Sequence, residues 1–161
     1  MITDLDMKHL RRCVELARSA LQEGNPPFGS LLVAADGNVL TEDHNRSSGG
    51  DLTRHPEFAL ARWAAENMTL EERGKATVYT SGEHCSMCAA AHGWVGLGRI
   101  VYATSSSQLA GWMAELGVPS SKVRTLPISE VIRDTIAEGP VDELANEMRL
   151  LHVLRHRPKD K

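Results

Sequence analysis

The sequence is poor in cysteine and has no long apolar stretch. Three cysteines in a chain of 161 residues without an export signal argue against a disulfide framework. No apolar run approaches the roughly 18 residues that a membrane-spanning helix needs. The first twenty residues, MITDLDMKHLRRCVELARSA, contain many charged side chains of both signs, unlike a targeting segment. We therefore expect a soluble, cytoplasmic protein with no membrane contact.

The chain also lacks an excess of basic charge. Its formal net charge is −3 with the histidines neutral, whereas a nucleic-acid-binding protein usually shows a basic patch or stripe. The C-terminal stretch HVLRHRPKDK is basic, and its cations suit either a phosphate ligand or the negative end of a helix. We favour the helix end because short charge runs are usually solvated. The expected partner is therefore a small molecule, and nucleic acid is not expected.

Hydrophobic spacing predicts a helix near the N-terminus. Apolar residues recur at helical intervals through residues 10–21, after a capping candidate at Thr3, and Gly24 supplies a stop signal. Cys13 lies on this apolar stripe. Its position indicates a role in core packing rather than as a ligand.

Two short strands, a loop and a second helix are predicted next. The runs SLLVAA and NVLTED, separated by Asp36 and Gly37, are typical of a β-hairpin. Residues 44–54 are polar and glycine-rich, which indicates a loop, a common place for functional residues. Proline at position 56, followed by strong helix formers, then predicts a helix that begins beside His55.

The second half of the chain predicts alternating strands and helices. Residues 76–104 form a β-α-β pattern, which implies two parallel strands joined by a right-handed crossover. The remaining elements are a helix, a last strand and a closing helix, over residues 107–117, 122–127 and 141–151. We therefore predict one α/β domain over residues 1–161, with three layers in which a mixed five-stranded sheet is flanked by helices.

Two cysteines three apart, in EHCSMCAAA, suit a redox pair, a structural clip or a metal site. Cys85 and Cys88 open one predicted helix as His55 opens another, and the positive end of a helix dipole favours the thiolate that a metal needs. One imidazole and two thiolates give a tetrahedral zinc ion three protein ligands, with the fourth position left for water. Glu57, two residues after His55, is near enough to transfer that water's proton. A redox pair is the weakest interpretation because it leaves His55 and Glu57 unexplained.

These residues form part of a longer pattern. His-x-Glu followed by Cys-x-x-Cys is the signature of zinc deaminases. The stretches PPFGSLLV, the Asn in DHNRS, HPEFALAR, TSGEHCSMCAAA and GRIVYAT follow in that family's order and spacing, over roughly residues 25–105. The chain thus resembles the cytidine and deoxycytidylate deaminase superfamily, in its guanine, cytosine and tRNA-adenosine deaminase branch. The resemblance implies a cytidine deaminase-like fold and a single zinc-dependent deaminase domain over residues 1–161.

The resemblance also implies roles for individual residues. His55, Cys85 and Cys88 would bind Zn²⁺, Glu57 would shuttle protons, and Asn45 would hydrogen-bond the ring of the substrate. Water activated by zinc would attack the ring carbon that bears the amino group, and ammonia would leave. An asparagine between a strand and a loop is also an ordinary turn residue. Relatives are commonly dimers, so a homodimer is expected by analogy.

Two positions depart from the family pattern. His84 replaces the usual proline before the first cysteine, where it is either an ionisable donor at the pocket rim or a solvated loop side chain. Pro56 replaces the usual alanine between His55 and Glu57, and proline has no backbone N–H to hold a substrate carbonyl. Substrate recognition is therefore expected to differ from that of close relatives.

Residues after the fourth strand bear on the substrate. By resemblance, Glu115 is the nearest candidate for the acidic residue that accepts ring N–H donors in guanine deaminase-like relatives, and Trp112 offers a stacking face. The alternative is a packed Trp112 and a solvated Glu115 on one helix, and Trp63 and Trp94 are expected in the core. We predict a hydrolase that deaminates free heterocycles such as guanine, isocytosine, cytosine or amino-s-triazines. A tRNA-adenosine deaminase and a non-enzymatic zinc-stabilised interaction module are the alternatives.

Overall fold

One mixed sheet organises the chain, which the computed structural model describes over residues 1–158. The strands are β1 (Gly29–Val33), β2 (Val39–His44), β3 (Thr77–Gly82), β4 (Arg99–Thr104) and β5 (Ala137–Glu138). The helices are α1 (Asp4–Gln22), α2 (Pro56–Asn67), α3 (Leu70–Lys75), α4 (Ser86–Val95), α5 (Ser106–Glu115), α6 (Ile128–Val131) and α7 (Asp142–His156), with a 3-10 turn at Ser47–Gly49. The strand order is β2-β1-β3-β4-β5. β1 runs antiparallel to β2 and β3, whereas β3, β4 and β5 run parallel.

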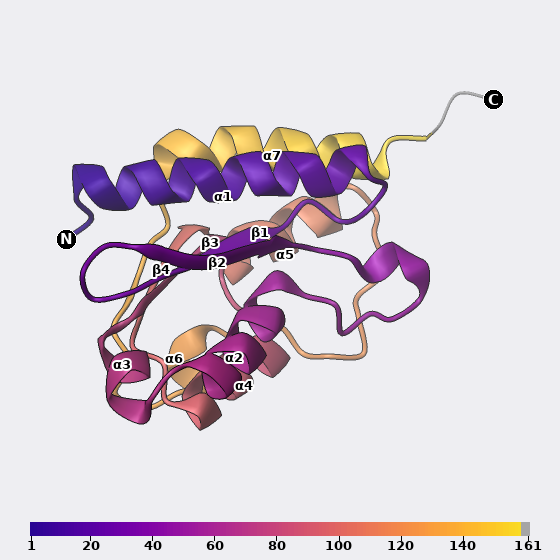
Figure 1. Ribbon diagram of the computed structural model, residues 1–161. Coiled ribbons are helices and arrows are strands. Elements are labelled where there is room, and N and C mark those ends of the chain that lie inside the picture. Colours follow the sequence, from indigo (N-terminus) through magenta and orange to yellow (C-terminus); the bar gives the residue numbers. More distant parts are fainter. Residues whose placement is uncertain (159–161) are drawn as a thin grey trace.

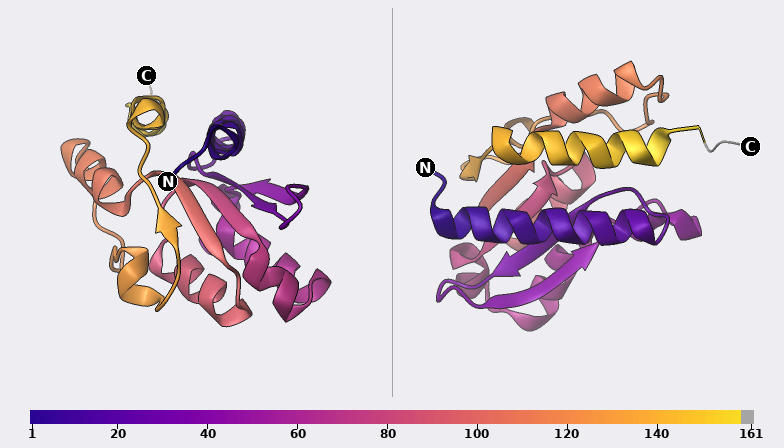
Figure 2. Two further views of the ribbon diagram at one scale, coloured as in Figure 1. Left: turned by 90° about the vertical axis from the view of Figure 1, so that its left-hand side faces the viewer. Right: turned by 90° about the horizontal axis from the view of Figure 1, so that it is seen from above.

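Helices cover both faces of this sheet. α1 and α7 lie side by side on one face, and α2, α3, α4 and α6 lie on the other (Figure 1 and Figure 2). One cluster of buried side chains joins α1 and α7 to the sheet, and a second joins α2 to the opposite face. This three-layer α/β/α arrangement around a mixed five-stranded sheet confirms the predicted fold class.

The N-terminal helix follows its predicted start and stop signals. The Thr3 hydroxyl accepts the N–H of Asp6 while the Asp6 carboxylate accepts the N–H of Thr3, which forms a capping box. The chain leaves the helix at Gly24, whose φ of +85° suits a residue without a side chain. Cys13 is fully buried in the cluster between α1 and the sheet, so its predicted core position is confirmed.

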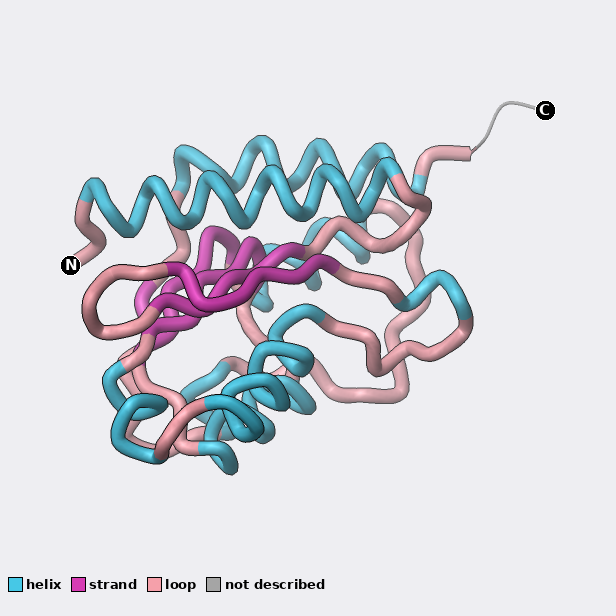
Figure 3. The backbone as a smooth tube through the Cα atoms, viewed as in Figure 1, coloured by secondary structure: helices cyan, strands magenta, loops and turns pink. Residues whose placement is uncertain are grey.

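The predicted β-hairpin forms from β1 and β2, with Gly37 at a φ of +89° in its turn. Side chains alternate along β1, so that Leu31 packs on the α1 side and Leu32 packs on the α2 side. Ser30 shares the parity of Leu32, which brings its hydroxyl to the α2 side. The loop from β2 to α2, interrupted by the 3-10 turn, then leads the chain to that same side (Figure 3).

The predicted β-α-β unit consists of β3, α4 and β4. The two strands pair in parallel, and α4 ends at Gly96 with a φ of +75°, a common helix terminator. α2 and α4 pack against each other on one face of the sheet. Their N-termini, at His55 and Cys85, therefore lie close together.

The position predicted for the fifth strand is wrong. Residues 122–127 form a largely exposed loop that ends at Pro127, the residue before α6. The fifth strand is instead β5, whose two residues pair with Ile100 and Val101 of β4. Two paired residues leave no alternating pattern in a sequence, so the longer and more strand-like run KVRTLP was the misleading signal.

The core positions predicted for Trp63 and Trp94 are confirmed for one tryptophan only. Trp63 packs against the α2-side cluster as predicted, whereas Trp94 is 90% exposed, so its predicted core position is wrong.

α7 carries Arg155 and His156 in its last turn, where cations offset the negative end of the helix dipole. Residues 159–161 of the basic tail lie outside the described residues. Within residues 1–158, none of the helices combines the length and the apolar character that crossing a membrane requires.

Candidate active site

Three potential metal ligands meet where α2 and α4 begin. His55 is the N-cap residue of α2, Cys85 is the N-cap residue of α4, and Cys88 lies in the first turn of α4. The Nδ1 atom of His55 is 3.5 Å from Cys85 Sγ and 3.6 Å from Cys88 Sγ, and all three ligand atoms lie within 4.8 Å of one another. Tetrahedral zinc, with bonds of about 2.0 Å to nitrogen and about 2.3 Å to sulfur, places such ligand atoms about 3.6 Å apart. The donor set and its spacing therefore fit a zinc ion.

The electrostatics of this group favour a negatively charged sulfur. A hydrogen bond from Cys88, opposed by burial and assisted by His55, lowers the pKa of Cys85 to about 4. The Cys85 sulfur and burial together raise the pKa of Cys88, and the hydrogen bond to Cys85 raises the pKa of His55. The group thus favours a thiolate at Cys85. This suits a divalent cation, because zinc binds thiolate and neutral imidazole.

Glu57 provides a buried carboxylate beside the three potential ligands. It lies in the first turn of α2, two residues after His55, and is 6% exposed. Its Oε1 atom accepts a hydrogen bond from Thr80 Oγ1 at 2.7 Å, and Ser30 Oγ lies 3.0 Å from the same oxygen. Burial raises the pKa of Glu57, and the Thr80 hydrogen bond and the charge of His55 oppose this effect. A carboxylate with a raised pKa exchanges protons closer to neutral pH, as a general acid and base must.

The loop before α2 presents the carboxamide of Asn45. Asn45 is 2% exposed. Its Oδ1 accepts a hydrogen bond from the Ser47 backbone N–H at 2.8 Å and another from the Ser47 hydroxyl at 2.7 Å. Its backbone N–H donates to the carbonyl of Phe28. Within residues 1–158, no hydrogen bond engages Asn45 Nδ2. The amide is thus held by its oxygen, and its N–H₂ group remains available to a ligand.

The turn before α4 is tied to two later segments. Glu83 Oε2 accepts the N–H of Ser106 in α5, and Glu83 Oε1 accepts the N–H of Ile128 in α6, both at 2.8 Å. Ser86 Oγ also donates to the carbonyl of Arg124 at 2.8 Å. One carboxylate therefore caps the N-termini of two helices and anchors the turn from which the cysteines project.

Sequence analysis missed three residues that support this arrangement, namely Ser30, Thr80 and Glu83. Ser30 and Thr80 are hydroxyl residues inside predicted buried strands, where a polar side chain usually signals a hydrogen-bonding partner. Glu83 stands two residues before the first cysteine, where an acidic side chain can reach a helix N-terminus. These sequence signals identify the three residues as hydrogen-bonding residues, but they do not predict the groups to which they bond.

His84 is buried against α4. It is 1% exposed, and within residues 1–158 neither of its ring nitrogens has a hydrogen-bond partner. Its ring meets that of His92 edge to face, with centroids 5.3 Å apart. Burial, followed by the nearby His92, lowers the pKa of His84 well below its usual range. The alternative of a solvated loop side chain is therefore wrong, and the burial of both nitrogens does not support the other alternative, a donor at the pocket rim.

Trp112 and Glu115 are engaged with α7 rather than with the three potential ligands. Glu115 is exposed, and its carboxylate accepts a hydrogen bond from Arg149 of α7 at 2.8 Å. Trp112 packs against the α1-side core, with its ring centroid 6.0 Å from that of His152. These contacts match the alternative of a packed tryptophan and a solvated glutamate, and they do not support contact of either residue with a base.

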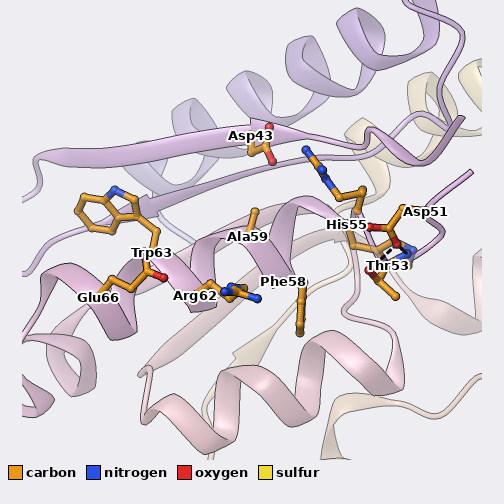
Figure 4. A pocket seen from close by; sticks show the side chains of 10 residues that line it. Asp43, Asp51, Thr53, His55, Phe58, Ala59, Arg62, Trp63 and Glu66 are labelled. Atoms are coloured by element: carbon orange, nitrogen blue, oxygen red, sulfur yellow. Dashed lines mark hydrogen bonds between the residues drawn. The ribbon is translucent and has the colours of Figure 1, made fainter. Parts of the chain in front are cut away.

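A groove of about 490 Å³ lies beside His55 and follows the outer side of α2 (Figure 4). Its charged lining residues are of both signs: Asp43, Asp51, Arg54, Arg62 and Glu66. Mixed charge of this kind does not form the basic surface that nucleic acid requires. Among the predicted site residues, only His55 lines this groove.

Comparisons with known proteins agree with this geometry. Residues 3–104 match the family model described as the cytidine and deoxycytidylate deaminase zinc-binding region. A probable cytosine deaminase from Schizosaccharomyces pombe is 32% identical over 108 residues, which are 67% of this chain and 65% of that protein. A tRNA-specific adenosine deaminase from Agrobacterium fabrum is 36% identical over 103 residues, which are 63% of this chain and 66% of that protein. The chain thus spans just under two thirds of the length of these relatives.

The fold is shared with a solved structure of a guanine deaminase from Nitrosomonas europaea. The TM-score is 0.71 at 17% identity, over 97% of this chain and 86% of that chain. Identity this low shows likeness of fold alone. The family model, by contrast, matches well over half of the sequence and includes His55, Glu57, Cys85 and Cys88. This chain therefore belongs to the cytidine and deoxycytidylate deaminase family and carries its zinc-binding region.

Proposed function

We propose that this protein is a zinc-dependent hydrolytic deaminase that removes an exocyclic amino group from a free nucleobase-like heterocycle and releases ammonia. The observation that carries the proposal is the approach of His55 Nδ1 to the sulfurs of Cys85 and Cys88, at 3.5 and 3.6 Å, beside the buried carboxylate of Glu57. Three protein ligands leave a tetrahedral ion one position for solvent, as in catalytic zinc sites. Within residues 1–158 no further histidine, cysteine or carboxylate joins the group to close it.

A zinc ion held by His55, Cys85 and Cys88 would supply a Lewis acid that makes water a nucleophile near neutral pH. Glu57 moves the protons of the reaction. It accepts one from the attacking water and delivers it to the ring nitrogen beside the amino-bearing carbon. It then carries the proton of the added hydroxyl group to the amino group, which leaves as ammonia. The C–N bond breaks, the ring retains the oxygen, and ammonia carries the nitrogen away.

Asn45 is the proposed anchor for the ring. Its Oδ1 is engaged by Ser47, so its Nδ2 group can donate to a ring nitrogen or carbonyl of the substrate. Pro56 offers no backbone N–H at the start of α2, which makes the Asn45 amide the more important donor. Glu115 and Trp112 are engaged with α7, so this proposal assigns them no role. Guanine, cytosine, isocytosine and amino-s-triazines all remain candidate substrates.

A second candidate is deamination of adenosine in tRNA, which is favoured by the 36% identity to a tRNA-specific adenosine deaminase. The charge of the chain favours a free base instead. The formal net charge is −3, and the arginines of the groove beside His55 stand among aspartate and glutamate. A protein that binds an anticodon arm needs several phosphate contacts, and its affinity falls steeply with salt.

The experiment that tests the proposal measures ammonia release from a panel of aminopurines, aminopyrimidines and amino-s-triazines by the zinc-loaded protein. Turnover of one or more free bases, with no binding of an anticodon stem-loop at low salt, is the expected result. Salt-sensitive binding and deamination of the stem-loop would show that the substrate is tRNA rather than a free base. Stoichiometric zinc without turnover of any substrate would instead favour a zinc-stabilised interaction module.

We further propose that the protein acts as a homodimer, as its family resemblance implies. Trp94 on α4 is 90% exposed, and contact with a second copy would cover this large apolar side chain. Light scattering on the eluting protein gives the mass of the particle in solution. A monomer mass at micromolar concentration would reject the dimer.

A further inference from the structure

Ser30 and Thr80 face each other across the junction of β1 and β3. They are register partners in the antiparallel pairing of these strands, and both are fully buried. Leu32 and Val78, two residues away on the same strands, pack in the α2-side cluster. Because side chains on a strand alternate, the two hydroxyls also face α2, the helix whose first turn carries Glu57.

The hydroxyls form a short chain of hydrogen bonds that ends on one oxygen of Glu57. Thr80 Oγ1 is 2.7 Å from Glu57 Oε1, Ser30 Oγ is 2.8 Å from Thr80 Oγ1, and Ser30 Oγ is 3.0 Å from Glu57 Oε1. Thr80 Oγ1 is also 2.9 Å from the carbonyl oxygen of Gly82. Each hydroxyl has one proton to donate. The two shortest contacts use both protons when Ser30 donates to Thr80 and Thr80 donates to Glu57, and such chains strengthen their members.

Both hydroxyl oxygens lie within 3.0 Å of Oε1, and within residues 1–158 no side-chain hydrogen bond reaches Oε2. A glutamate side chain with free torsions would exchange its two oxygens, and a buried carboxylate without donors would be unfavourable. The hydroxyls on the sheet hold the carboxylate from one side, so they supply it with a donor and prevent its two oxygens from exchanging places. The other oxygen is then left for proton transfer.

We propose that Thr80, supported by Ser30, is a positioning residue for Glu57 that holds Oε1 against the sheet and leaves Oε2 without a side-chain hydrogen bond, free for proton transfer. The inference rests on the proposed deaminase function, in which Glu57 moves the protons. Loss of a hydrogen-bond partner that orients a metal-site residue commonly lowers activity by about 10- to 100-fold. The loss is expected in kcat rather than in KM, because Thr80 is fully buried and acts through Glu57.

Three variants test the role of Thr80. Thr80→Val keeps the shape of the side chain and removes the donor, whereas Thr80→Ser keeps the donor and removes a methyl group. Thr104→Val is the matched control, since Thr104 is a buried threonine on the neighbouring strand β4 whose hydroxyl donates to the carbonyl of Ser81 at 2.8 Å. We expect kcat to fall about 10- to 100-fold in Thr80→Val with bound zinc and KM nearly unchanged, and to recover in Thr80→Ser. Thr104→Val should keep its kcat.

Crystal structures of the zinc-loaded wild type and of both Thr80 variants give a readout that does not need activity. Glu57 Oε1 should stay on residue 80 in Thr80→Ser, and the carboxylate should turn or spread over several rotamers in Thr80→Val. An unchanged kcat in Thr80→Val, equal losses in Thr80→Val and Thr80→Ser, or an unmoved Glu57 would overturn the proposal. If Thr80→Val does not fold, Ser30→Ala takes its place, with a smaller loss of kcat and the same displacement expected.

The two proposals fail in different ways. If the wild-type protein deaminates none of the offered amines, the deaminase function is lost, yet the Glu57 orientation in the crystals still decides the role of Thr80. If the wild type is active and Glu57 keeps its position in Thr80→Val, the deaminase stands and the positioning role falls.

Discussion

His55 Nδ1 and Cys85 Sγ lie 3.5 Å apart although the two residues are separated by 30 positions in the chain. Each is the N-cap residue of its helix, and neither side chain caps its own helix. N-cap positions usually hold Ser, Thr, Asp or Asn, whose side chains stabilise the helix by about 1 kcal/mol. Two helices therefore forgo a capping side chain and direct a potential metal ligand at the same point. The folded chain should recover this stability when it binds the metal.

Removal of zinc is accordingly expected to lower the thermal stability of the protein. Free zinc at about 100 times its dissociation constant adds about 2.7 kcal/mol, which corresponds to roughly 5–11 °C in Tm for a domain of this size. Scanning calorimetry with zinc and with a chelator measures the difference. Cys85→Ser should abolish it, whereas Cys13→Ala, which changes a buried cysteine outside the group, should retain it. Equal Tm values for the wild type with and without zinc would contradict the assignment of this group as a metal site.

Replacement of Glu57 by glutamine separates catalysis from stability. Glu57→Gln keeps an oxygen that can accept the hydrogen bond of Thr80, and it removes the group that carries protons. We expect kcat to fall by about 10²- to 10⁴-fold, with zinc content unchanged. Burial raises the pKa of Glu57, so the native state disfavours its ionised form and loses stability as pH rises above the ordinary glutamate value.

The zinc-free Glu57→Gln protein should therefore be more stable than the zinc-free wild type at pH 7. Urea unfolding of both proteins at pH 7 and at pH 4.5 measures this gain, which should shrink at the lower pH. Full turnover by Glu57→Gln would exclude Glu57 as the proton carrier. A gain in unfolding free energy that does not depend on pH would show that the raised pKa of Glu57 is not its cause.

The zinc group was predictable from the sequence, whereas its support was not. His55 and Cys85 each open a helix, so local signals place each residue at a helix start, and the family resemblance implied that they meet. The pairing of Ser30 with Thr80 depends on the register of two strands that are distant in the sequence, and no local pattern encodes that register. His84 was misjudged for the same reason, because the packing of the turn against α4, rather than its polar neighbours, decides its burial.

Acid should destabilise the protein through His152. Burial, with a smaller contribution from His156, lowers the pKa of His152 to about 4, and its ring packs against Phe28 and Trp112. Above its unfolded pKa of about 6.5 the residue is neutral in both states and has no effect. As pH falls from there toward 4, the unfolded chain takes up a proton that the native state rejects, so stability falls by about 3 kcal/mol in total.

Urea unfolding at a series of pH values between 7 and 4 checks this expectation. His152→Leu should show a shallower fall over that range than the wild type, by about 3 kcal/mol. His156→Gln should change the curve much less, because His156 is exposed at the end of the same helix and supplies only the smaller of the two causes that lower the pKa of His152. The same pH dependence in His152→Leu and the wild type would place the acid sensitivity elsewhere.

Glu83 should stabilise the fold by capping two helices at once. Glutamine offers one acceptor oxygen to the two N–H groups of Ser106 and Ile128, so Glu83→Gln leaves one of them without its partner and removes the negative charge from both helix N-termini. The free energy of unfolding is expected to fall by about 1–2 kcal/mol. Glu71→Gln is the control, since it breaks an exposed ion pair with Lys75 that contributes about 0.5 kcal/mol at most.

Trypsin provides a local test of the same contact. Lys122 and Arg124 are exposed in the loop between α5 and α6, the two helices that Glu83 holds. Loss of one cap should let this loop open more often below the temperature of global unfolding, and cleavage after these two residues should then become faster in Glu83→Gln than in Glu71→Gln. Faster cleavage here without a matching increase elsewhere would identify Glu83 as a local tether. Equal cleavage rates in the two variants, together with equal unfolding free energies, would mean that the two 2.8 Å contacts of Glu83 contribute no more than a surface ion pair.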